Sequence, residues 1–491
     1  MKRLTVALFA MIAMLFGTFG VADAAVTWGD AQAVPGLDTL GQNGSAISSV
    51  ILCPTAELCA ALGRYNTAPD VSHGFKTGVM QGTWVDATDI SGLEALNTGG
   101  SIDITASGCA PETYCVIAGT YSDGPGQTQG FVLASDGSPA VAIPGLAALN
   151  LGNQVFVNSV ACSSVGNCVV VGSYTDGSNV LSAFYVELDN GVWQNAASLG
   201  TAGALKTVSC WADGECVAAG WLTNGVTWVP AAMTRSGGGW TMPVSIQGVN
   251  VLGTGEGSID HLSCPVADTC FGIGVYSVGQ GQGVFTTSLS NGTWSNAVQL
   301  GGIASLDTGG YPVAVDLSCW TATSCLSAGN YSDATGTHGW SAEITGGTWG
   351  SATDLPVASD FGSDGTTYTT AMSCASDGMC AIVGLYGEAA IAPGSINTLG
   401  GANVSQGFVS LRDPSGTMLD AMAIPGLAAL NTGGYADPKS VSCTIGFCGI
   451  SGFFYVGNDY NAFVATMTIT PDPEPTTTTT SIDPVAPAFT G

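Results

Sequence analysis

The sixteen cysteines are the residues of this chain with the most evident chemistry. They form eight close pairs, seven with five intervening residues and the last with four. Such pairs could bind zinc or form disulfides, but zinc sites usually contain C-x2-C pairs with nearby histidines. This sequence has no C-x2-C pair and only three scattered histidines, so we predict eight local disulfides. They are Cys53–Cys59, Cys109–Cys115, Cys162–Cys168, Cys210–Cys216, Cys264–Cys270, Cys319–Cys325, Cys374–Cys380 and Cys443–Cys448.

Groups for hydrolytic catalysis are scarce. Arg64, Arg235 and Arg412 are the only arginines after residue 24, and the last two fall in outer strands of the repeat described below. An arginine cluster of the kind that sialidase-like hydrolases need is therefore not expected. Many pairs of carboxylates are available for a glycosidase, yet no pair stands out.

The three histidines favour structural roles. His73 and His338 occupy equivalent positions, each before a glycine and an aromatic residue, which makes them part of the repeat. His261 falls in an inner strand and could face the centre of the fold, where a hydrogen-bonded structural role is the favoured interpretation. A Ser-His-Asp triad therefore has little support.

Three recurrent aspartates are weak candidates for calcium ligands, because carboxylate oxygens are the ligands that Ca²⁺ prefers. They are Asp123, Asp176 and Asp333. None belongs to a dense D-x-D-x-D-G series, so solvated turn residues are the alternative that we favour. No other cofactor is expected.

The cysteine pairs belong to a longer repeat, whose first cysteines recur about every 50 residues. We number the units 1 to 8 by their cysteine pairs. Four residues after the second cysteine, every unit has a glycine, usually followed by a tyrosine. Next come an apolar segment and a Gly-x-Trp turn. In several units, a phrase such as Pro-Gly-Leu-Ala-Ala-Leu-Asn follows. The repeated glycines are Gly63, Gly119, Gly172, Gly220, Gly274, Gly329, Gly384 and Gly452.

Each unit therefore predicts four short antiparallel strands separated by turns, without helical periodicity. Four-stranded units of this length are typical of propeller blades. We predict an all-β, eight-bladed β-propeller over residues 25–470, with a disulfide closing the hairpin of the first two strands in each blade. Unit 8 lacks its own Gly-x-Trp strand, and residues 26–37 match that phrase. The N-terminal strand should therefore complete the last blade and close the ring.

The predicted strand order sorts the loops onto two faces. The disulfide hairpins and the Gly-x-Trp turns share one face. The opposite face carries the loops after the second and fourth strands, which are rich in carboxylates, amides and tyrosines. The longest of these is Gly387–Ser405 in unit 7, about twice the usual length, and long loops in compact repeats are often functional. We expect the binding surface on this face.

The units resemble the cysteine-paired repeats, V-S-C-x5-C-x3-G-x-Y, of secreted bacterial propeller proteins, from residue 26 to about 470. The segment Ser288-Leu-Ser-Asn-Gly-Thr-Trp294 is also similar to a shortened Asp-box of sialidase-type propellers, although it lacks the aspartate. In that group the motif stabilises a turn remote from the active site. The resemblance therefore implies a related fold and no activity.

The two ends of the chain differ from the repeat. Residues 1–24 combine Lys2 and Arg3 with an apolar run and end in Ala-Asp-Ala, which predicts a cleaved signal peptide. Residues 471–491 are rich in proline and threonine, which predicts a disordered tail. The protein is therefore expected to be exported, without membrane insertion.

Charge limits the partners. The chain has 36 acidic and 8 basic residues, a formal net charge of −28, so it cannot neutralise a nucleic-acid backbone. We expect a monomeric, extracellular, non-catalytic binding protein whose partner is a glycan or another protein. The alternative is a secreted carbohydrate-active hydrolase. Internal repetition favours binding, because a catalytic site requires residues that break the repeat.

Overall fold

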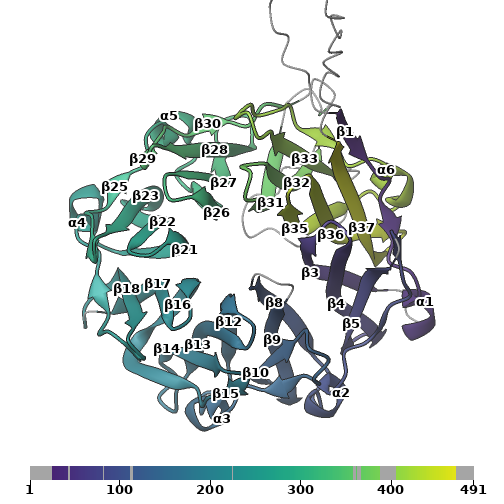
Figure 1. Cartoon of the computed structure of the whole chain (residues 1–491), viewed down its shortest axis with the longest axis horizontal. Coiled ribbons are helices and arrows are strands. Elements are labelled where there is room, and N and C mark those ends of the chain that lie inside the picture. The colour runs from purple at the N-terminus through teal and green to yellow at the C-terminus, as the bar shows by residue number, and fades with distance from the viewer. Residues whose placement is uncertain are drawn as a thin grey trace, which may run out of the picture.

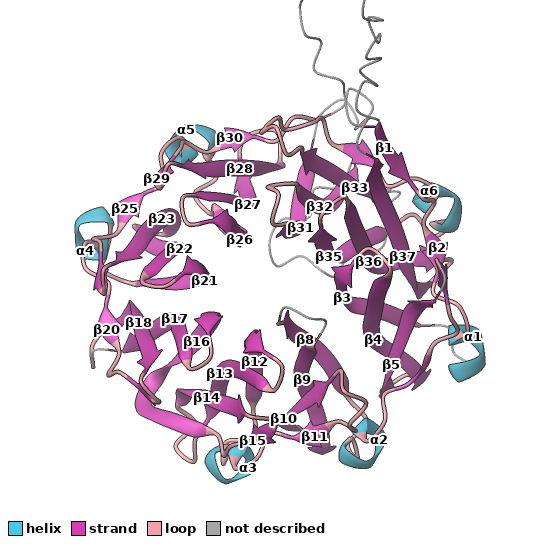
Figure 2. Ribbon diagram, viewed as in Figure 1, coloured by secondary structure: helices cyan, strands magenta, loops and turns pink. Residues whose placement is uncertain are grey.

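The computed structural model describes residues 25–41, 45–80, 82–110, 114–223, 225–357, 361, 366–387 and 405–470. The predicted signal peptide, the predicted tail and residues 388–404 of the unit 7 segment lie outside these described residues. The described chain is mostly β-strand, in antiparallel sheets arranged around a common centre, as the all-β prediction requires (Figures 1 and 2).

Eight units of three long antiparallel strands make up most of these sheets, each strand pairing with the next along the chain. The strands nearest the centre are β3 (Ala46–Thr55), β8 (Ile102–Cys109), β12 (Val155–Ser164), β16 (Ala197–Ala212), β21 (Gly257–Val266), β26 (Val313–Thr321), β31 (Thr367–Cys374) and β35 (Ala436–Thr444). The second strands are β4 (Leu58–Ala68), β9 (Cys115–Gly124), β13 (Asn167–Thr175), β17 (Glu215–Thr223), β22 (Thr269–Val278), β27 (Ser324–Ser332), β32 (Cys380–Gly387) and β36 (Phe447–Val456). The third strands are β5 (Val71–Met80), β10 (Gln127–Ala134), β14 (Leu181–Asp189), β18 (Trp228–Ser236), β23 (Gly281–Ser290), β28 (Thr337–Thr345), β33 (Ser405–Arg412) and β37 (Asp459–Thr470).

The fourth position of each sheet is less regular than the sequence predicts. In units 1, 4, 5, 6 and 8 it consists of two short strands, both paired with the third strand. The short strands are β1 (Ala25–Trp28), β2 (Gln32–Ala33), β6 (Thr83–Trp84), β7 (Thr88–Asp89), β11 (Val141–Ala142), β15 (Val192–Trp193), β19 (Gly239–Trp240), β20 (Val244–Ser245), β24 (Thr293–Trp294), β25 (Val298–Gln299), β29 (Thr348–Trp349), β30 (Thr353–Asp354) and β34 (Met422–Ala423). In unit 3, the start of β16 pairs with β14 before β16 continues into unit 4, so these two units form one nine-stranded sheet.

Among the described residues, six single-turn helices follow the outer strands at the periphery of the molecule, a feature that the strand prediction missed (Figure 2). They are α1 (Leu37–Leu40), α2 (Leu93–Leu96), α3 (Leu146–Leu149), α4 (Val249–Leu252), α5 (Ile303–Leu306) and α6 (Leu427–Leu430). The Pro-Gly-Leu-Ala-Ala-Leu-Asn phrase forms such a helix because Gly145 adopts a φ of 74° and Leu146 is buried. No helix among the described residues is long and apolar enough to cross a membrane.

The core explains the repeated glycine. In seven units this glycine lies opposite a fully buried aromatic residue of the third strand, as Gly63 lies opposite Phe75. A Cβ on Gly63 would collide with the carbonyl oxygen of Ile47 on β3 and lie 2.8 Å from the Phe75 ring. All eight repeated glycines meet a first-strand carbonyl in this way. The buried aromatics are Phe75, Phe131, Phe184, Phe285, Trp340, Phe408 and Phe463.

The eight disulfides are present in the predicted pairs, with Cα–Cα distances of 3.9 to 4.2 Å. In several units the serine before the first cysteine accepts a hydrogen bond from the next unit. The backbone N–H of Cys264 donates to Ser209 Oγ at 3.0 Å, and that of Cys53 donates to Ser442 Oγ at 2.9 Å. The repeated Ser-Cys pair therefore joins neighbouring units as well as closing a hairpin.

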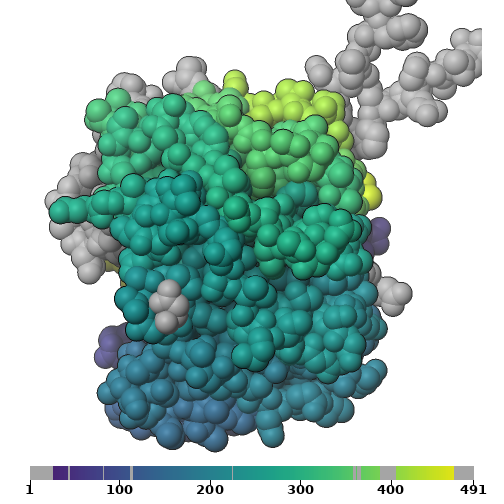
Figure 3. All heavy atoms as spheres, turned by 90° about the vertical axis from the view of Figure 1, so that its left-hand side faces the viewer, coloured from purple at the N-terminus to yellow at the C-terminus, as the bar shows by residue number. Residues whose placement is uncertain are grey.

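Units adjacent in sequence pack side by side. Figure 3 shows the teal and green residues in continuous contact on one side of the molecule. Unit 1 also packs against unit 8, because β3 contacts β35 and β36. β1 pairs antiparallel with β37, with Ala25 opposite Thr470, and β2 pairs with the same strand. The first and last strands of the described chain therefore lie together, as Figure 1 shows.

A β-bulge interrupts each strand nearest the centre at the same register, next to the partner of the repeated glycine. A bulge leaves one residue out of the ladder. The unpaired residues are Ser49, Thr105, Asn158, Lys206, Asp260, Val315, Thr370 and Lys439. Each unit therefore has one position, at the bulge, where the residue type differs between units while the pairing of the two strands stays the same.

Candidate functional site

Four aromatic rings lie together on unit 8. Tyr455 and Tyr460 are opposite each other in β36 and β37, Phe453 lies two residues before Tyr455, and Tyr435 directly precedes β35. Neighbouring ring centroids are 5.7 to 6.1 Å apart, and Tyr435 meets Tyr455 edge to face. All four side chains are partly exposed. We call these four residues the unit 8 aromatic cluster.

A buried carboxylate lies beside this cluster. Asp437 is opposite Phe453 in the β35–β36 ladder, so both side chains project from the same face. Lys439 Nζ lies 2.6 Å from Asp437 Oδ2, and the Tyr435 hydroxyl is 3.3 Å from the same oxygen. The Asp437 side chain is 6% exposed, and its Oδ1 has no hydrogen-bond partner among the described residues. A buried acceptor without a partner costs about 1–3 kcal/mol, which a ligand donor would recover.

Burial governs the protonation of this site. It raises the pKa of Asp437, while the neighbouring Lys439 ammonium opposes that rise. Burial also raises the pKa of Tyr435, and the charge of Asp437 raises it further. The pKa of Tyr455 is raised for the same first reason. The phenols therefore remain protonated at neutral pH and can donate hydrogen bonds.

Neighbouring units contribute to the surroundings of the cluster. From β4 of unit 1, Asn66 Nδ2 donates to the Tyr460 hydroxyl at 3.2 Å. From β31 of unit 7, Tyr368 lies close enough to Asp437 for the carboxylate charge to raise its pKa, although burial is the larger cause. The site thus draws on residues of units 7, 8 and 1.

The site breaks the repeat. The residues at the register of Asp437 in units 1 to 7 are Ile47, Asp103, Phe156, Ala204, Ser258, Val313 and Tyr368. Only unit 8 combines a carboxylate there with three tyrosines and a lysine. The residues that the units share do not predict this site, because none of its side chains belongs to the repeat. The aromatic run Phe453–Tyr455, which no other unit contains, was the available signal.

A second polar group lies on the inner strands of units 4, 5 and 6. His261 Nδ1 is 3.9 Å from Asp316 Oδ1. Burial raises the pKa of Asp260, and the charge of the nearby Lys206 opposes that rise. Burial lowers the pKa of His261 to about 4, while a backbone hydrogen bond to Ala314 opposes the shift. Burial raises the pKa of Asp316 to about 6, and the N–H of Leu317 opposes it. His261 is therefore neutral at physiological pH.

Replacing Asp316 with asparagine should stabilise the protein more at pH 7.5 than at pH 4.5. The raised pKa means that the folded state favours protonated Asp316, so its stabilising contribution is present at acid pH and is lost as pH rises through about 6. The full shift corresponds to about 3 kcal/mol, but the side chain is 38% exposed, so an effect on the order of 1 kcal/mol is expected. Melting temperatures of both proteins at the two pH values measure this. An identical difference at both pH values would contradict it.

The three calcium candidates lie in turns or strand ends. Asp176 Oδ1 accepts hydrogen bonds from the N–H groups of Ser178 and Val180, and Asp333 Oδ1 accepts from Thr335. Asp123 is exposed near the end of β9. In the part of the chain that the structure describes, no group of three or more His, Cys, Asp or Glu side chains could hold a metal ion. A calcium role for these residues stays a prediction.

The histidines of the repeat have equivalent surroundings. His73 stacks on Tyr65 with ring centroids 5.4 Å apart, and His338 stacks on Tyr331 at 5.3 Å. Each also contacts a carboxylate: His73 Nδ1 lies 2.6 Å from Glu94, and His338 Nε2 lies 3.2 Å from Asp333. These contacts agree with the structural roles that the sequence favours.

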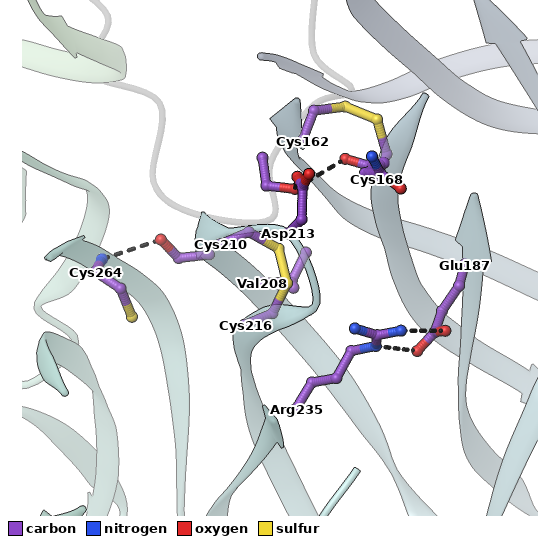
Figure 4. Close-up of a disulfide and its surroundings, with 12 residues drawn as sticks. Cys162, Cys168, Glu187, Val208, Cys210, Asp213, Cys216, Arg235 and Cys264 are labelled. Atoms are coloured by element: carbon purple, nitrogen blue, oxygen red, sulfur yellow. Dashed lines mark hydrogen bonds and ion pairs between the residues drawn. A yellow bond between two sulfur atoms is a disulfide. The ribbon is translucent and has the colours of Figure 1, made fainter. Parts of the chain in front are cut away.

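Two of the three arginines after residue 24 join neighbouring units. Arg235 binds both carboxylate oxygens of Glu187 at 2.7 and 3.1 Å (Figure 4). Arg412 Nε lies 2.7 Å from Glu343, and its guanidinium lies 4.6 Å from the centre of the Trp320 ring. Both side chains are largely buried. They therefore serve the contacts between units and are not available to a ligand.

The disulfide face carries a cavity of about 350 Å³ between units 3 and 4. Its lining includes Glu187, Asp213 and Arg235, beside the Cys210–Cys216 disulfide (Figure 4). The sequence predicts little chemical variety on this face, because its short disulfide-closed turns differ little from one another. Here, however, the polar groups bind one another, since Asp213 accepts hydrogen bonds from Ser163 and Ser164 at 2.8 and 2.6 Å.

The predicted sorting of loops agrees with the hydrogen bonds of units 1 and 2. The N–H of Gly99, in the loop after the fourth strand of unit 1, donates to Ser122 O near the end of β9. The N–H of Ser72, at the start of β5, donates to Gly100 O. The loops after the second and fourth strands therefore share one face. The segment Gly387–Ser405, predicted to determine specificity there, is described only at its two ends.

Comparisons with known proteins complete the description. No protein-family model matches the sequence, and no curated protein matches it. Among solved structures, the chain is similar to a protein of unknown function from Dyadobacter fermentans, with 10% identity over 91% of this chain and 99% of that one and a TM-score of 0.41. It is similar to the GH74 xyloglucanase from Xanthomonas campestris, with 12% identity over 90% and 68% of the chains and a TM-score of 0.42. It is also similar to the six-bladed propeller lectin of Aleuria aurantia, with 13% identity over 64% and 96% and a TM-score of 0.34. At these values the likenesses carry no argument about function.

Proposed function

We propose that this protein is an extracellular, non-catalytic binding protein whose glycan ligand is held by the unit 8 aromatic cluster and Asp437. The observation that carries the proposal is the buried, unpartnered Oδ1 of Asp437 beside partly exposed aromatic rings. Binding sites combine apolar and aromatic surface with a few placed polar groups. Sugars present both a C–H face and hydroxyl donors, which match the rings and the carboxylate.

The proposed scaffold is an eight-bladed β-propeller closed by the N-terminal strand. Eight units with the same three-strand pattern, the contact of β3 with β35 and the pairing of β1 with β37 support this reading. In a closed ring, the aromatic cluster would lie at the junction of the last and first blades. The contact between Asn66 and Tyr460 crosses that junction.

The proposed location is outside the cell. Eight disulfides are typical of proteins from oxidising compartments. We propose that residues 1–24 are removed and that residues 471–491 form a tail outside the folded unit. The working form would then be a monomer.

A secreted carbohydrate-active hydrolase is the second candidate. It is favoured by one observation, the Tyr435 hydroxyl 3.3 Å from the buried carboxylate of Asp437. Glycoside hydrolysis usually requires a second carboxyl group at a defined separation, and such a partner is not evident within the cluster. Release of free sugar from the bound glycan by the wild-type protein, but not by Asp437→Asn, would favour this candidate over binding alone.

The test is a glycan array with the chain from residue 25 onwards, followed by titration of the best glycan. Tyr455→Ala and Asp437→Asn should each weaken binding at least about tenfold, since aromatic and buried polar contacts at the centre of an interface contribute more than about 1 kcal/mol. Tyr311→Ala is the matched control, because Tyr311 is 54% exposed in another unit and its hydroxyl bonds only to Gln280 O.

The control variant should bind like the wild type. The proposal is wrong if no glycan on the array binds, or if the best glycan binds both site variants with unchanged affinity while their melting temperatures are normal.

A further inference from the structure

Among the described residues, Arg64 is the one arginine whose guanidinium forms no hydrogen bond or ion pair, although its charge acts on the carboxyl of Asp103. It lies on β4, opposite Ile47 of β3, and is partly buried. It makes no hydrogen bond or ion pair with any residue that the structure describes. Arg235 and Arg412 both bind glutamates, which is the expected result in a chain with 36 acidic and 8 basic residues. An unpaired arginine is therefore unusual in this protein.

The position of Arg64 brings it near the unit 8 site. Asn66, two residues further along β4, donates to Tyr460 of the aromatic cluster. Burial raises the pKa of Asp103. Arg64 and Lys439 both lie close enough for their charges to oppose that rise. Lys439 in turn lies over the Phe453 ring, 5.5 Å from its centre, with its side chain 39% exposed. Lys439 therefore lies at the site, and Arg64 lies on the strand whose Asn66 reaches Tyr460, with both cations in electrostatic range of Asp103.

A partly buried guanidinium without a partner loses hydration and gains no hydrogen bond in return. A carboxylate can recover this loss, since it accepts two parallel hydrogen bonds from the guanidinium fork. The net charge of −28 repels anions at long range, so an anionic ligand would need local cations of this kind. A neutral sugar would leave Arg64 unpaired.

We infer that the glycan carries a carboxylate, as uronic-acid saccharides do, and that Arg64 binds this group with support from Lys439. This inference rests on the proposed function, because it assigns the ligand class of the same site. The aromatic cluster and Asp437 would hold the sugar rings and hydroxyls. Arg64 would then determine specificity for the acidic residue of the chain.

The experiment uses a panel of galacturonate, glucuronate and mannuronate oligosaccharides together with their methyl esters, which remove the charge and keep the ring. The best acidic oligosaccharide should bind at least about tenfold more tightly than its ester. Arg64→Gln should reduce binding of the acid to the level of the ester and leave ester binding unchanged. Arg64→Lys, which keeps the charge and loses the fork, should be intermediate.

The matched control is Lys76→Gln, which removes an exposed charge from the neighbouring strand β5 and should change neither affinity. Increasing sodium chloride should weaken binding of the acid by the wild type more than by Arg64→Gln.

Equal affinity for acid and ester, or an equal loss for both in Arg64→Gln, would overturn the inference. If neutral glycans bind as tightly as the acidic ones, in a manner that depends on Tyr455, the carboxylate assignment alone is wrong and the proposed function stands. If neither acidic nor neutral glycans bind, both are wrong.

Discussion

Gly274→Ala is expected to lower the free energy of unfolding by about 3 kcal/mol, near the upper end of ordinary point substitutions. A Cβ at this position would collide with the carbonyl oxygen of Ser258 and lie 2.9 Å from the Cα of Ile259, so the backbone of β21 itself would have to shift. Gly274 also lies opposite Phe285, which is completely buried. Urea unfolding, with the midpoint and the slope both measured, gives the change in stability.

Gly239→Ala provides the matched control, because a Cβ there has no heavy atom within 4 Å and Gly239 is not in the left-handed region. That variant should unfold like the wild type. If Gly274→Ala shows the same midpoint as the control, the close approach of the first and second strands is wrong, and with it the physical reason for the repeated glycine.

Deletion of residues 25–37 is expected to destabilise the protein by several kcal/mol and to cause aggregation. The deleted segment contains β1 and β2, the two strands that pair with β37, and it also removes Ala31 and Val34 from the core. Exposure of the β37 edge would then offer unpaired N–H and C=O groups to other molecules. Thermal unfolding and size-exclusion chromatography measure both effects.

A circular permutant keeps this prediction specific. Because Ala25 lies opposite Thr470, a short turn after residue 470 can connect to residue 25, so that the chain ends at residue 37. This permutant should recover the stability that the deletion loses. An unchanged melting temperature for the deletion itself would show that the N-terminal strand does not hold the ring together.

Sequence reasoning predicted the parts of the fold that each unit determines locally. Cysteine spacing predicted the disulfides because each pair closes one hairpin, and the structure forms all eight. The match between residues 26–37 and the missing fourth strand of unit 8 predicted the pairing of β1 with β37. These features depend on short segments that repeat, so one unit explains the others.

The features that sequence reasoning missed depend on how backbone segments meet in space. The single-turn helices follow from a glycine with positive φ and a buried leucine, a combination that leaves no periodic pattern in four residues. β16 continues from unit 3 into unit 4, and the connection between these two units lacks the Pro-Gly-Leu phrase. The bulges of the inner strands leave no residue signature, since their unpaired residues range from valine to lysine.

The candidate site was missed for a related reason. Asp437 is in β35 and Tyr435 directly precedes it, whereas Phe453 is in β36, and only the register of the two strands brings Phe453 to the face of Asp437. The placement of function on the loops after the second and fourth strands stays a prediction, and the chosen segment in unit 7 is described only at its ends. The bridge between Ser405 and Tyr435 places one end of that segment beside the aromatic cluster.

Hydrogen exchange of the protein with and without the best glycan shows where the ligand is held, and it needs no substituted protein. It therefore tests whether the unit 8 aromatic cluster and Asp437 bind the glycan. We expect bound glycan to slow exchange in peptides that contain Tyr435 to Lys439 and Phe453 to Tyr460, and in the β4 peptide that contains Arg64. Peptides of the disulfide face near Asp213 should exchange as before. Protection confined to the disulfide face, with the unit 8 peptides unchanged at saturating glycan, would contradict the account.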